Sequence, residues 1–403
     1  MTSLSHCLCW AALAPLAAGA ARADLTYLEK EMPADAHYLH IGDPAPDFHL
    51  PGVDGRTYSL DSFKDAPVLM VAFMSNHCPC SHAAETRLLP LYAKYRSRGL
   101  AVIAINPNSP AGLDVSELGY SKYNDTFADM KVYARAQGFT FPYVYDGETQ
   151  RVAKAYGCQC TPDIFIFDRA RRLRYEGRLD NSEYPEPETV TRHEAADAVA
   201  ALLAGQPVPV PVTSPFGCAT KWIEKQGAIA QINERWESTP VTLAPIDGAG
   251  VAALVRNPTA NIRLINVWAT WCVPCVEEFP NLVHLIRQFQ TRRFELITVS
   301  LDAPDHRAQA LRFLQKQHAA LPDRLAKVLP AEGRQTDNYL FQGRAEDLQA
   351  ALDPQWPGPV PYTLIVGPGG KVLYRHIGPI DLAEVRSQLV DRLGRYYNPV
   401  TKD

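Results

Sequence analysis

The sequence lacks an apolar run long enough to cross a bilayer, because its longest, residues 8–18, falls well short of the roughly 20 apolar residues that a membrane-spanning helix needs. An excess of charge of one sign is also missing, since 40 basic residues stand against 44 acidic ones. No phosphate-cradling glycine loop and no serine-histidine hydrolase pattern is present. We therefore expect no membrane span in the mature chain, no nucleic-acid partner and no organic cofactor.

The first 23 residues have the features of an export signal. The apolar stretch is followed by Ala21-Arg22-Ala23, an Ala-x-Ala cleavage site, before Asp24. We expect cleavage after Ala23 and a mature protein in the periplasm. Cysteines in an oxidising compartment are usually paired, metal-bound or catalytic. The mature chain would keep seven of them: Cys78, Cys80, Cys158, Cys160, Cys218, Cys272 and Cys275.

A Cys-x-x-Cys motif stands where a strand-like run meets a helical pattern. The apolar run begins at Leu264, and apolar residues at helical spacing follow Cys275. A thiolate at a helix N-terminus is stabilised by unpaired N–H groups and by the helix dipole. Cys272 should therefore act as a nucleophile toward disulfides, and Cys275 should resolve the mixed disulfide. An inert disulfide and half of a zinc site are the alternatives, but a second ligand pair is absent nearby, which favours redox chemistry.

The chain contains two copies of one structural pattern. Residues 68–80 repeat the outline of the Cys-x-x-Cys segment, with an apolar run followed by Cys-Pro-Cys at the start of a helical pattern. In both halves the order is strand, helix, strand, helix, strand, strand and helix. Alternating units of this kind predict an α/β protein with two tandem domains, each a mixed central sheet covered by helices.

The composition suggests where the two domains divide. We place the first domain at 24–205 and the second at 223–403. The segment between them, 206–222, is rich in proline, and such a segment is typically extended and semi-rigid. We expect it to be a linker that holds the domains apart while allowing them to meet.

Both halves resemble known families. The motif Trp-x-x-Trp-Cys-Val-Pro-Cys, with Glu278 and Pro280, resembles the TlpA/ResA-like branch of the thioredoxin superfamily over about 223–397. The first half resembles AhpC/TSA-type, peroxiredoxin-like redoxin proteins over about 40–222, on the motifs Asn76-His-Cys-Pro, Cys160-Thr-Pro-Asp163 and Gly217-Cys-Ala-Thr-Lys-Trp222. These resemblances imply two thioredoxin-fold domains that exchange thiols and disulfides through cysteines alone.

The thioredoxin resemblance also implies roles for residues around the cysteines. A cis-proline in that superfamily packs against the active cysteines and leaves the preceding backbone free to pair with substrate. By resemblance this role falls to Thr161-Pro162 and to Val360-Pro361. A buried aspartate normally precedes the first cysteine by six residues, but Asn266 stands there and cannot titrate. Glu278 is then the candidate for proton handling, with a solvated helix carboxylate as the alternative interpretation.

Four cysteines of the first half suggest a second redox centre. Cys78 and Cys80 are one residue apart, so a disulfide between them would close a small, strained ring that is easily reduced. Cys158 and Cys160 stand just before Pro162, and the two pairs meet if that proline faces the helix. The predicted centre uses Cys78, Cys80 and Cys160. The alternative is a Cu or Zn site made by all four cysteines, with His77 and His82 as possible further ligands.

A thiol peroxidase is the remaining alternative for the first half. A peroxiredoxin carries Pro-x-x-x-Thr/Ser-x-x-Cys and a later arginine, which together activate the thiolate. Here Ser75 and Cys78 match, but Val71 and Pro162 occupy the places of the proline and the arginine, and Arg178 is the candidate substitute. Without the arginine a peroxidatic thiolate loses electrostatic support.

The interpretation favoured by the sequence is an exported thiol-disulfide oxidoreductase. Its partners would be protein thiols and disulfides and a redox partner protein, and its cofactors would be none beyond redox-active disulfides. A peroxiredoxin-like antioxidant enzyme and a Cys-based Cu or Zn chaperone are the alternatives.

Overall fold

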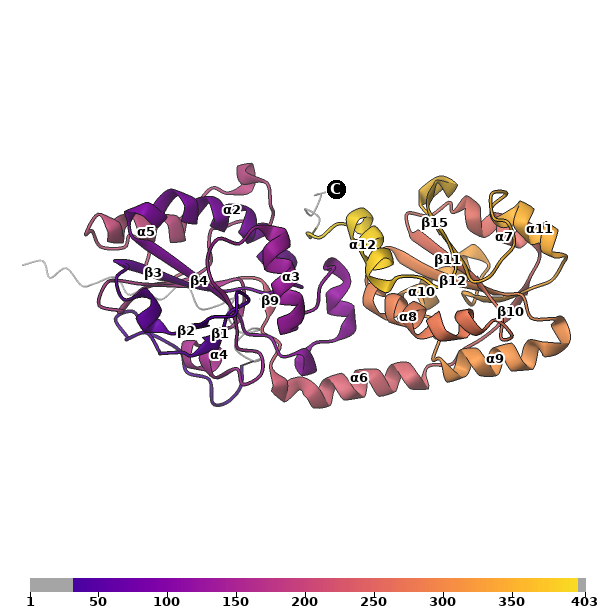
Figure 1. The fold of residues 1–403 in the computed structure, drawn as a ribbon, viewed down its shortest axis with the longest axis horizontal. Helices are drawn as coiled ribbons and strands as arrows, with labels where there is room; N and C mark the ends of the chain where they lie inside the picture. Colours follow the sequence, from indigo (N-terminus) through magenta and orange to yellow (C-terminus); the bar gives the residue numbers. More distant parts are fainter. Residues whose placement is uncertain (1–31, 398–403) are drawn as a thin grey trace, which may run out of the picture.

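The computed structural model describes residues 32–397, which form two α/β units side by side (Figure 1). Each unit has a central mixed sheet covered by helices, which confirms the predicted fold class. The export signal expected at 1–23 lies outside the described residues. Among residues 32–397 no helix is both long enough and apolar enough to traverse a bilayer.

The first unit is built on a sheet of strand order β5-β4-β3-β7-β8. Strands β3 (Val68–Phe73), β4 (Leu100–Asn106) and β5 (Tyr143–Tyr145) are parallel. Strand β7 (Asp163–Phe167) pairs antiparallel with β3, and β8 (Leu173–Gly177) pairs antiparallel with β7. Every residue of β3 is buried, as expected of a central strand with both faces covered.

Helices cover the two faces of this sheet unequally. One face packs against α2 (Pro79–Tyr95), α3 (Phe127–Gln137) and α5 (Glu194–Leu203). The other face packs against α4 (Arg151–Tyr156) and the segment that precedes β3. Because side chains alternate along a strand, successive residues of β3 enter the two cores in turn.

The second unit has a six-stranded sheet of order β10-β13-β12-β11-β14-β15. Its strands are β10 (Ala244–Ile246), β11 (Ile262–Trp268), β12 (Phe294–Ser300), β13 (Asn338–Phe341), β14 (Tyr362–Val366) and β15 (Val372–Ile377). β10 to β13 are mutually parallel, while β14 is antiparallel to β11 and to β15. The sheet is therefore mixed, like the first.

Helices again cover both faces of the second sheet. α8 (Val273–Phe289), α9 (Arg307–Lys316) and α12 (Leu382–Leu393) contribute to one core. α7 (Gly248–Arg256) and α11 (Ala345–Leu352) contribute to the other. The short α10 (Asp323–Val328) precedes β13 in the chain.

The two units share one order of elements. The order β3-α2-β4-α3 and then β7-β8-α5 recurs as β11-α8-β12-α9 and then β14-β15-α12, which confirms the predicted repeat. Between the two parts the first unit has β5, α4 and β6 (Cys160–Thr161), and the second has α10, β13 and α11. The short strands β10, at the sheet edge, and β13, beside it, were not predicted, because three or four residues are too few to show a period of two. Smaller pairs in the first unit are β1 (Leu50–Pro51) with β2 (Thr57–Tyr58) and β6 with β9 (Cys218–Ala219).

The proline-rich segment 206–222 lies along the first unit. The N–H of Glu176 donates to the carbonyl of Pro211 (3.0 Å), and the N–H of Thr213 donates to the carbonyl of Glu176 (3.0 Å). β9, near the end of the segment, pairs antiparallel with β6. Proline lacks an N–H but keeps its carbonyl, so a proline-rich strand can still accept hydrogen bonds at a sheet edge. The exact domain boundaries stay a prediction.

Helix α6 (Gln226–Ser238) runs from the first unit to the second (Figure 1). The units also touch directly, where the 3-10 helix η4 (Val115–Tyr120) packs against α8. The Gln288 amide donates to the carbonyl of Leu118 (3.0 Å), and the guanidinium of Arg292 lies 3.7 Å from the centre of the Tyr120 ring. The units are thus held by hydrogen bonds and a cation–π contact as well as by the connecting helix.

Candidate active sites

The dithiol of the second unit lies where β11 ends and α8 begins. Cys272 is the N-cap residue of α8, and a disulfide joins it to Cys275 with 5.3 Å between their Cα atoms. The N–H of Cys275 donates to the sulfur of Cys272 (3.3 Å). Once the disulfide is reduced, this N–H and the helix dipole stabilise a thiolate on Cys272.

The two sulfurs of this pair differ in access. The side chain of Cys275 is fully buried, whereas Cys272 keeps 5% of its surface exposed. The neighbours of Cys272 are far more open, with Trp271 at 62% and Val273 at 66% exposure. The sulfur of Cys272 is therefore the more accessible of the two, and exposed apolar side chains lie on both sides of it.

A hydrogen-bonded aspartate holds the loop before the dithiol. The Thr270 N–H donates to both carboxylate oxygens of Asp302 (3.1 and 3.2 Å), and the Thr270 hydroxyl donates to the same carboxylate (2.6 Å). The hydroxyl of Ser300, at the end of β12, also donates to Asp302 (2.7 Å). The loop that presents Cys272 is thereby tied to the neighbouring strand.

Both predicted proline loops contain a cis peptide bond, at Thr161-Pro162 and at Val360-Pro361, as expected. Val360 packs against the core that holds both cysteines of the second unit. The carbonyl of Thr161 accepts a hydrogen bond from Cys78. The Thr161-Pro162 loop therefore contacts Cys78, and the Val360-Pro361 loop borders the core that contains the dithiol. The role of the loops in substrate binding stays a prediction.

A buried carboxylate lies behind the dithiol of the second unit. Glu278, one turn after Cys275, accepts hydrogen bonds from the amide of Asn266 (2.9 Å) and from the N–H of Ile380 (2.8 Å). Burial raises the pKa of Glu278 more than these two hydrogen bonds lower it. The solvated-carboxylate interpretation is therefore wrong, because only 3% of Glu278 is exposed. Its role in proton handling stays a prediction.

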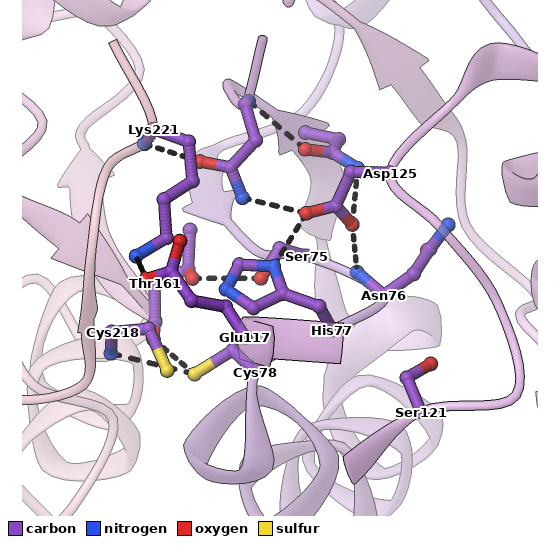
Figure 2. Close-up of polar contacts among 12 residues, drawn as sticks. Ser75, Asn76, His77, Cys78, Glu117, Ser121, Asp125, Thr161, Cys218 and Lys221 are labelled. Carbon is purple, nitrogen blue, oxygen red and sulfur yellow. Dashed lines mark hydrogen bonds and ion pairs between the residues drawn. The ribbon is translucent and has the colours of Figure 1, made fainter. Parts of the chain in front are cut away.

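The cysteine site of the first unit lies at the start of α2 (Figure 2). Cys78 is the N-cap residue and is fully buried. Its thiol donates to the carbonyl of Thr161 (2.9 Å), and its sulfur accepts the N–H of Cys218 (3.4 Å). The hydroxyls of Ser75 and Thr161 are hydrogen-bonded to each other nearby (2.8 Å). Two segments that lie 83 and 140 residues away in the sequence therefore contact one sulfur.

A buried histidine–aspartate pair lies beside Cys78. Nδ1 of His77 is 2.5 Å from Oδ2 of Asp125, and both side chains are buried. Burial lowers the pKa of His77, but the charge and hydrogen bond of Asp125 outweigh burial and raise it. The carboxylate also accepts the N–H of Asn76 (2.7 Å) and the amide of Asn108 (2.9 Å). Asp125 therefore stays ionised and favours the imidazolium form of His77.

The electrostatic surroundings favour a thiolate on Cys78. Burial would raise the pKa of Cys78, but hydrogen bonds from the thiols of Cys218 and Cys80 and the charge of His77 bring it well below the usual range. The Thr161 carbonyl opposes this effect, because it hydrogen-bonds only the protonated form. The neighbouring sulfurs behave oppositely: the thiolate beside them, together with burial, raises the pKa of both Cys80 and Cys218. One thiolate is thus held between two thiols.

The other predicted pair, Cys158 and Cys160, is buried within the first unit. Cys158 lies in the apolar core on the far side of the sheet, and burial raises its pKa. Cys160 is fully buried, burial raises its pKa as well, and its thiol lies 3.5 Å from the carbonyl of Pro162. The contact between this strand and Cys78 is made by the main-chain carbonyl of Thr161. Cys158 therefore lies apart from the site at Cys78, while the part of Cys160 in the second redox centre stays a prediction.

The positions of the side chains do not support the metal-site alternative. Within the described part of the chain, no group of three or more His, Cys, Asp or Glu side chains is placed to hold a metal ion. His77 is bound to Asp125, and His82 is hydrogen-bonded to the carbonyls of Asn76 (2.8 Å) and Arg395 (3.0 Å). These partners orient both rings as hydrogen-bonding groups.

The arginine substitute considered for a peroxidase is engaged elsewhere. Arg178 follows β8 and forms an ion pair with Glu194 of α5 (2.5 Å). Val71, in the place of the peroxiredoxin proline, lies in the middle of β3. Neither residue supplies the activating groups of a peroxidatic thiolate, although Cys78 itself is activated by His77.

Sequence analysis missed several groups around Cys78. Asp125 lies 48 residues from His77, in a loop without a local pattern. Lys221 forms an ion pair with Glu117, and its positive charge partly offsets the rise in the pKa of His77. The charge of the Cys78 thiolate contributes to raising the pKa of Lys221. The motif Gly217-Cys-Ala-Thr-Lys-Trp222 contained both Cys218 and Lys221, so it was the available signal. Nothing in that motif indicated which cysteine it approaches.

Comparison with known families shows which family the chain belongs to. The model of the AhpC/TSA family matches residues 41–176 and again residues 256–375, which together make up well over half of the chain. The chain belongs to the AhpC/TSA family. It is a redoxin protein of the thioredoxin superfamily, in which both halves carry the family's pattern.

Individual relatives point to thiol chemistry. A thiol-disulfide oxidoreductase ResA from Geobacillus thermodenitrificans is 27% identical over 134 residues, which cover 33% of this chain and 67% of the relative. A thiol:disulfide interchange protein DsbE homologue from Paracoccus denitrificans is 28% identical over 131 residues, covering 32% of this chain and 55% of the relative. A solved structure of a hypothetical protein from Sinorhizobium meliloti is 37% identical, covering 46% of this chain and 97% of that one, with a TM-score of 0.41. The named relatives support the expectation of an oxidoreductase.

Proposed function

We propose that this redoxin protein is an exported thiol-disulfide oxidoreductase that exchanges disulfides with protein substrates through Cys272 and Cys275. The observation that carries the proposal is the disulfide at the N-terminus of α8, with its outer sulfur framed by exposed Trp271 and Val273. Relatives with oxidoreductase and interchange names support it. A redox partner protein would return Cys272 and Cys275 to their starting oxidation state.

The exchange has two steps. In the reduced protein the thiolate of Cys272 attacks a substrate disulfide, one substrate thiolate leaves, and a mixed disulfide forms. Cys275 then loses its proton and attacks the sulfur of Cys272, which releases the second substrate thiolate. Two protein thiols are oxidised and one substrate disulfide is reduced to two thiols. Both steps also run in reverse when the substrate is the stronger reductant.

The loop at Val360-Pro361 is proposed to bind the substrate chain during these steps. Val360 packs against the core containing the dithiol, so a chain lying on this loop would be close to Cys272. The first unit would hold a second redox centre that passes or receives electrons by disulfide exchange. Cys78 and its neighbours, next to Thr161-Pro162, are the groups available for it.

Replacing Cys275 with serine should trap the mixed disulfide, because the resolving thiol is missing. Reduced Cys275→Ser protein mixed with insulin should form a covalent adduct that runs as one band on a non-reducing gel. Peptide mass mapping should place the insulin chain on Cys272, and dithiothreitol should release it. The matched control is Cys272→Ser/Cys275→Ser, which should form no adduct in the second unit. An adduct found only on a cysteine of the first unit would contradict the proposal.

Glu278→Gln should slow the exchange and change its pH profile. Glu278 lies one turn from Cys275, and burial raises its pKa, so its carboxylate form is present above that raised pKa. If it accepts the proton of Cys275, the wild-type rate rises with pH through this titration, and the variant loses both the inflection and about 10- to 100-fold in rate. The measurement is insulin reduction against pH. A uniform fall in rate with the inflection intact would indicate a structural role only.

Export is proposed from the sequence of residues 1–23. Cleavage after Ala23 would leave Asp24 as the first residue of the mature protein. Expression in a bacterial host, osmotic release of the periplasm and N-terminal sequencing would test this. Protein that stays with the spheroplasts with Met1 intact would count against export.

A thiol peroxidase is the second candidate, favoured by the buried, low-pKa thiolate of Cys78 beside His77. Peroxide consumption that requires Cys78 and not Cys272 would support it. The absence of an arginine contact to Cys78 among the described residues makes it the weaker candidate, because peroxide polarisation loses a charged donor.

A further inference from the structure

Three free cysteines of the first unit meet at the start of α2. The sulfur of Cys78 accepts the N–H of Cys218, and the thiols of Cys218 and Cys80 are both hydrogen-bonded to it. Figure 2 shows the sulfur atoms of Cys78 and Cys218 facing each other. Cys78 therefore has two possible disulfide partners within the same unit.

Strand pairing fixes the position of Cys218. β9 pairs antiparallel with β6, and Cys218 stands opposite Thr161, whose carbonyl contacts the thiol of Cys78. The strand approaches so closely that a Cβ at Gly217 would lie 2.1 Å from the carbonyl oxygen of Thr161. Glycine before Cys218 is thus required for this approach, which brings the cysteine to the site.

Cys80 is less well placed to form a disulfide with Cys78. The Cys80 thiol is hydrogen-bonded to Cys78, but only Pro79 separates the two cysteines in the chain. A bond between them would close a small ring and distort the first turn of α2. Cys218 comes from a separate strand, so a bond to it leaves the helix in place.

We propose that Cys78 and Cys218 are the exchanging pair of the first unit, with Cys78 as the attacking cysteine and Cys218 as the resolving one. This rests on the proposed function, because it assigns the partners of the second redox centre. It replaces Cys80 and Cys160 as the partners of Cys78.

The exchange balances in two steps. The thiolate of Cys78 attacks a disulfide of an incoming thiol compound or protein, and one thiolate leaves as the mixed disulfide forms. Cys218 gives its proton to the leaving group and attacks the sulfur of Cys78, which breaks the mixed bond. The Cys78–Cys218 disulfide forms, and the incoming disulfide is reduced to two thiols.

The surrounding charges suit these roles. The imidazolium of His77, held by Asp125, stabilises the thiolate of Cys78. Burial and the thiolate keep Cys218 protonated until a leaving group needs the proton. The attacking thiol must be ionised, whereas the resolving thiol must not compete for the substrate, so the two environments match the two steps.

Residues 394–397 of the second unit lie over this pair. The hydroxyl of Tyr397 is 3.5 Å from the sulfur of Cys218, and the carbonyl of Arg395 is hydrogen-bonded to His82 of α2 (3.0 Å). The ring of Tyr397 packs edge-on against Tyr120 (5.2 Å). Access is therefore restricted, so the pairing is best measured at equilibrium rather than as a rate.

The test uses the full chain with Cys272→Ser and Cys275→Ser, so that its result does not depend on the second unit. The protein is equilibrated in glutathione buffers from reducing to oxidising, alkylated, digested with trypsin without reduction and analysed by mass spectrometry. Trypsin places Cys78 and Cys80 in the peptide 65–87 and Cys218 in the peptide 193–221. A disulfide between these peptides should appear as the buffer becomes oxidising.

Two further variants in this background assign the sulfurs. With Cys80→Ser the cross-linked peptide should persist, and with Cys218→Ser it should disappear while glutathione accumulates on Cys78. A disulfide within 65–87 that Cys218→Ser leaves unchanged would overturn the proposal. So would three thiols that stay reduced in every buffer while circular dichroism shows a folded protein. Neither result would affect trapping at Cys272, so failure here is separate from failure of the proposed function.

Discussion

Cys272→Ser should lower the rate of insulin disulfide reduction by on the order of 1,000-fold or more, because the variant lacks the attacking thiolate. A serine hydroxyl does not ionise near neutral pH and cannot form the mixed disulfide. Cys272 keeps 5% of its surface exposed between the exposed side chains of Trp271 and Val273, whereas Cys275 is fully buried, so the sulfur of Cys272 is the more accessible one in this unit. The measurement is the turbidity of reduced insulin with dithiothreitol as the electron source.

Cys158→Ala is the matched control for this experiment. Cys158 is also a buried cysteine, but it lies in the apolar core of the first unit and makes no contact with either redox pair. This variant should reduce insulin at the wild-type rate. If Cys272→Ser kept most of the wild-type rate, the chemistry would belong to another cysteine and the central proposal would fail.

Arg263→Met should destabilise the second unit by about 3–5 kcal/mol, because it removes one partner from a buried charge network. Arg263 lies in β11 with 1% exposure and donates to Glu295 (2.8 Å) and to Glu332 (2.8 Å). Glu295 is fully buried, so its charge would depend on Arg334 alone. Urea unfolding followed by tryptophan fluorescence measures the loss.

The pH dependence of this loss has a definite sign. Burial alone would raise the pKa of Glu295, but Arg334 and Arg263 lower it below its ordinary value of 4.5. The stability that ionised Glu295 contributes to the fold is therefore present above pH 4.5 and is lost as the pH falls through the lowered pKa. The difference between wild type and Arg263→Met should be largest near neutral pH and should shrink in acid.

Arg344→Ala provides the comparison for Arg263→Met. Arg344 is paired with Asp347, but its side chain is 77% exposed. An exposed ion pair contributes little to stability, so this variant should unfold at nearly the wild-type urea concentration. An equal loss in both variants would show that charge removal in general, rather than burial, weakens the protein.

Patterns local in sequence predicted most of the fold. The apolar runs that became β3 and β11 and the helical patterns that became α2 and α8 each extend far enough along the chain to show their character. The repeated order of elements then identified two similar units. The strands β10 and β13 escaped prediction because three or four residues are too few to show a period of two.

The second candidate site was only partly predictable. Cys78 at the start of α2 and the cis bond at Pro162 followed from motifs. His77 and Asp125 are 48 residues apart in the sequence, and Asp125 lies in a loop, so no local pattern indicates that they pair. The position of Cys158 in the apolar core on the other face of the sheet was likewise not specified by a motif.

By itself the sequence determined the α/β class, the repeat and the dithiol at Cys272 and Cys275, because each depends on residues close together in the chain. Only the tertiary structure shows that Cys218 contacts the sulfur of Cys78. Cys218 is 140 residues away and reaches the site through the pairing of β9 with β6 and the close approach at Gly217. Such a contact depends on the path of the whole chain, and no local spacing encodes that path.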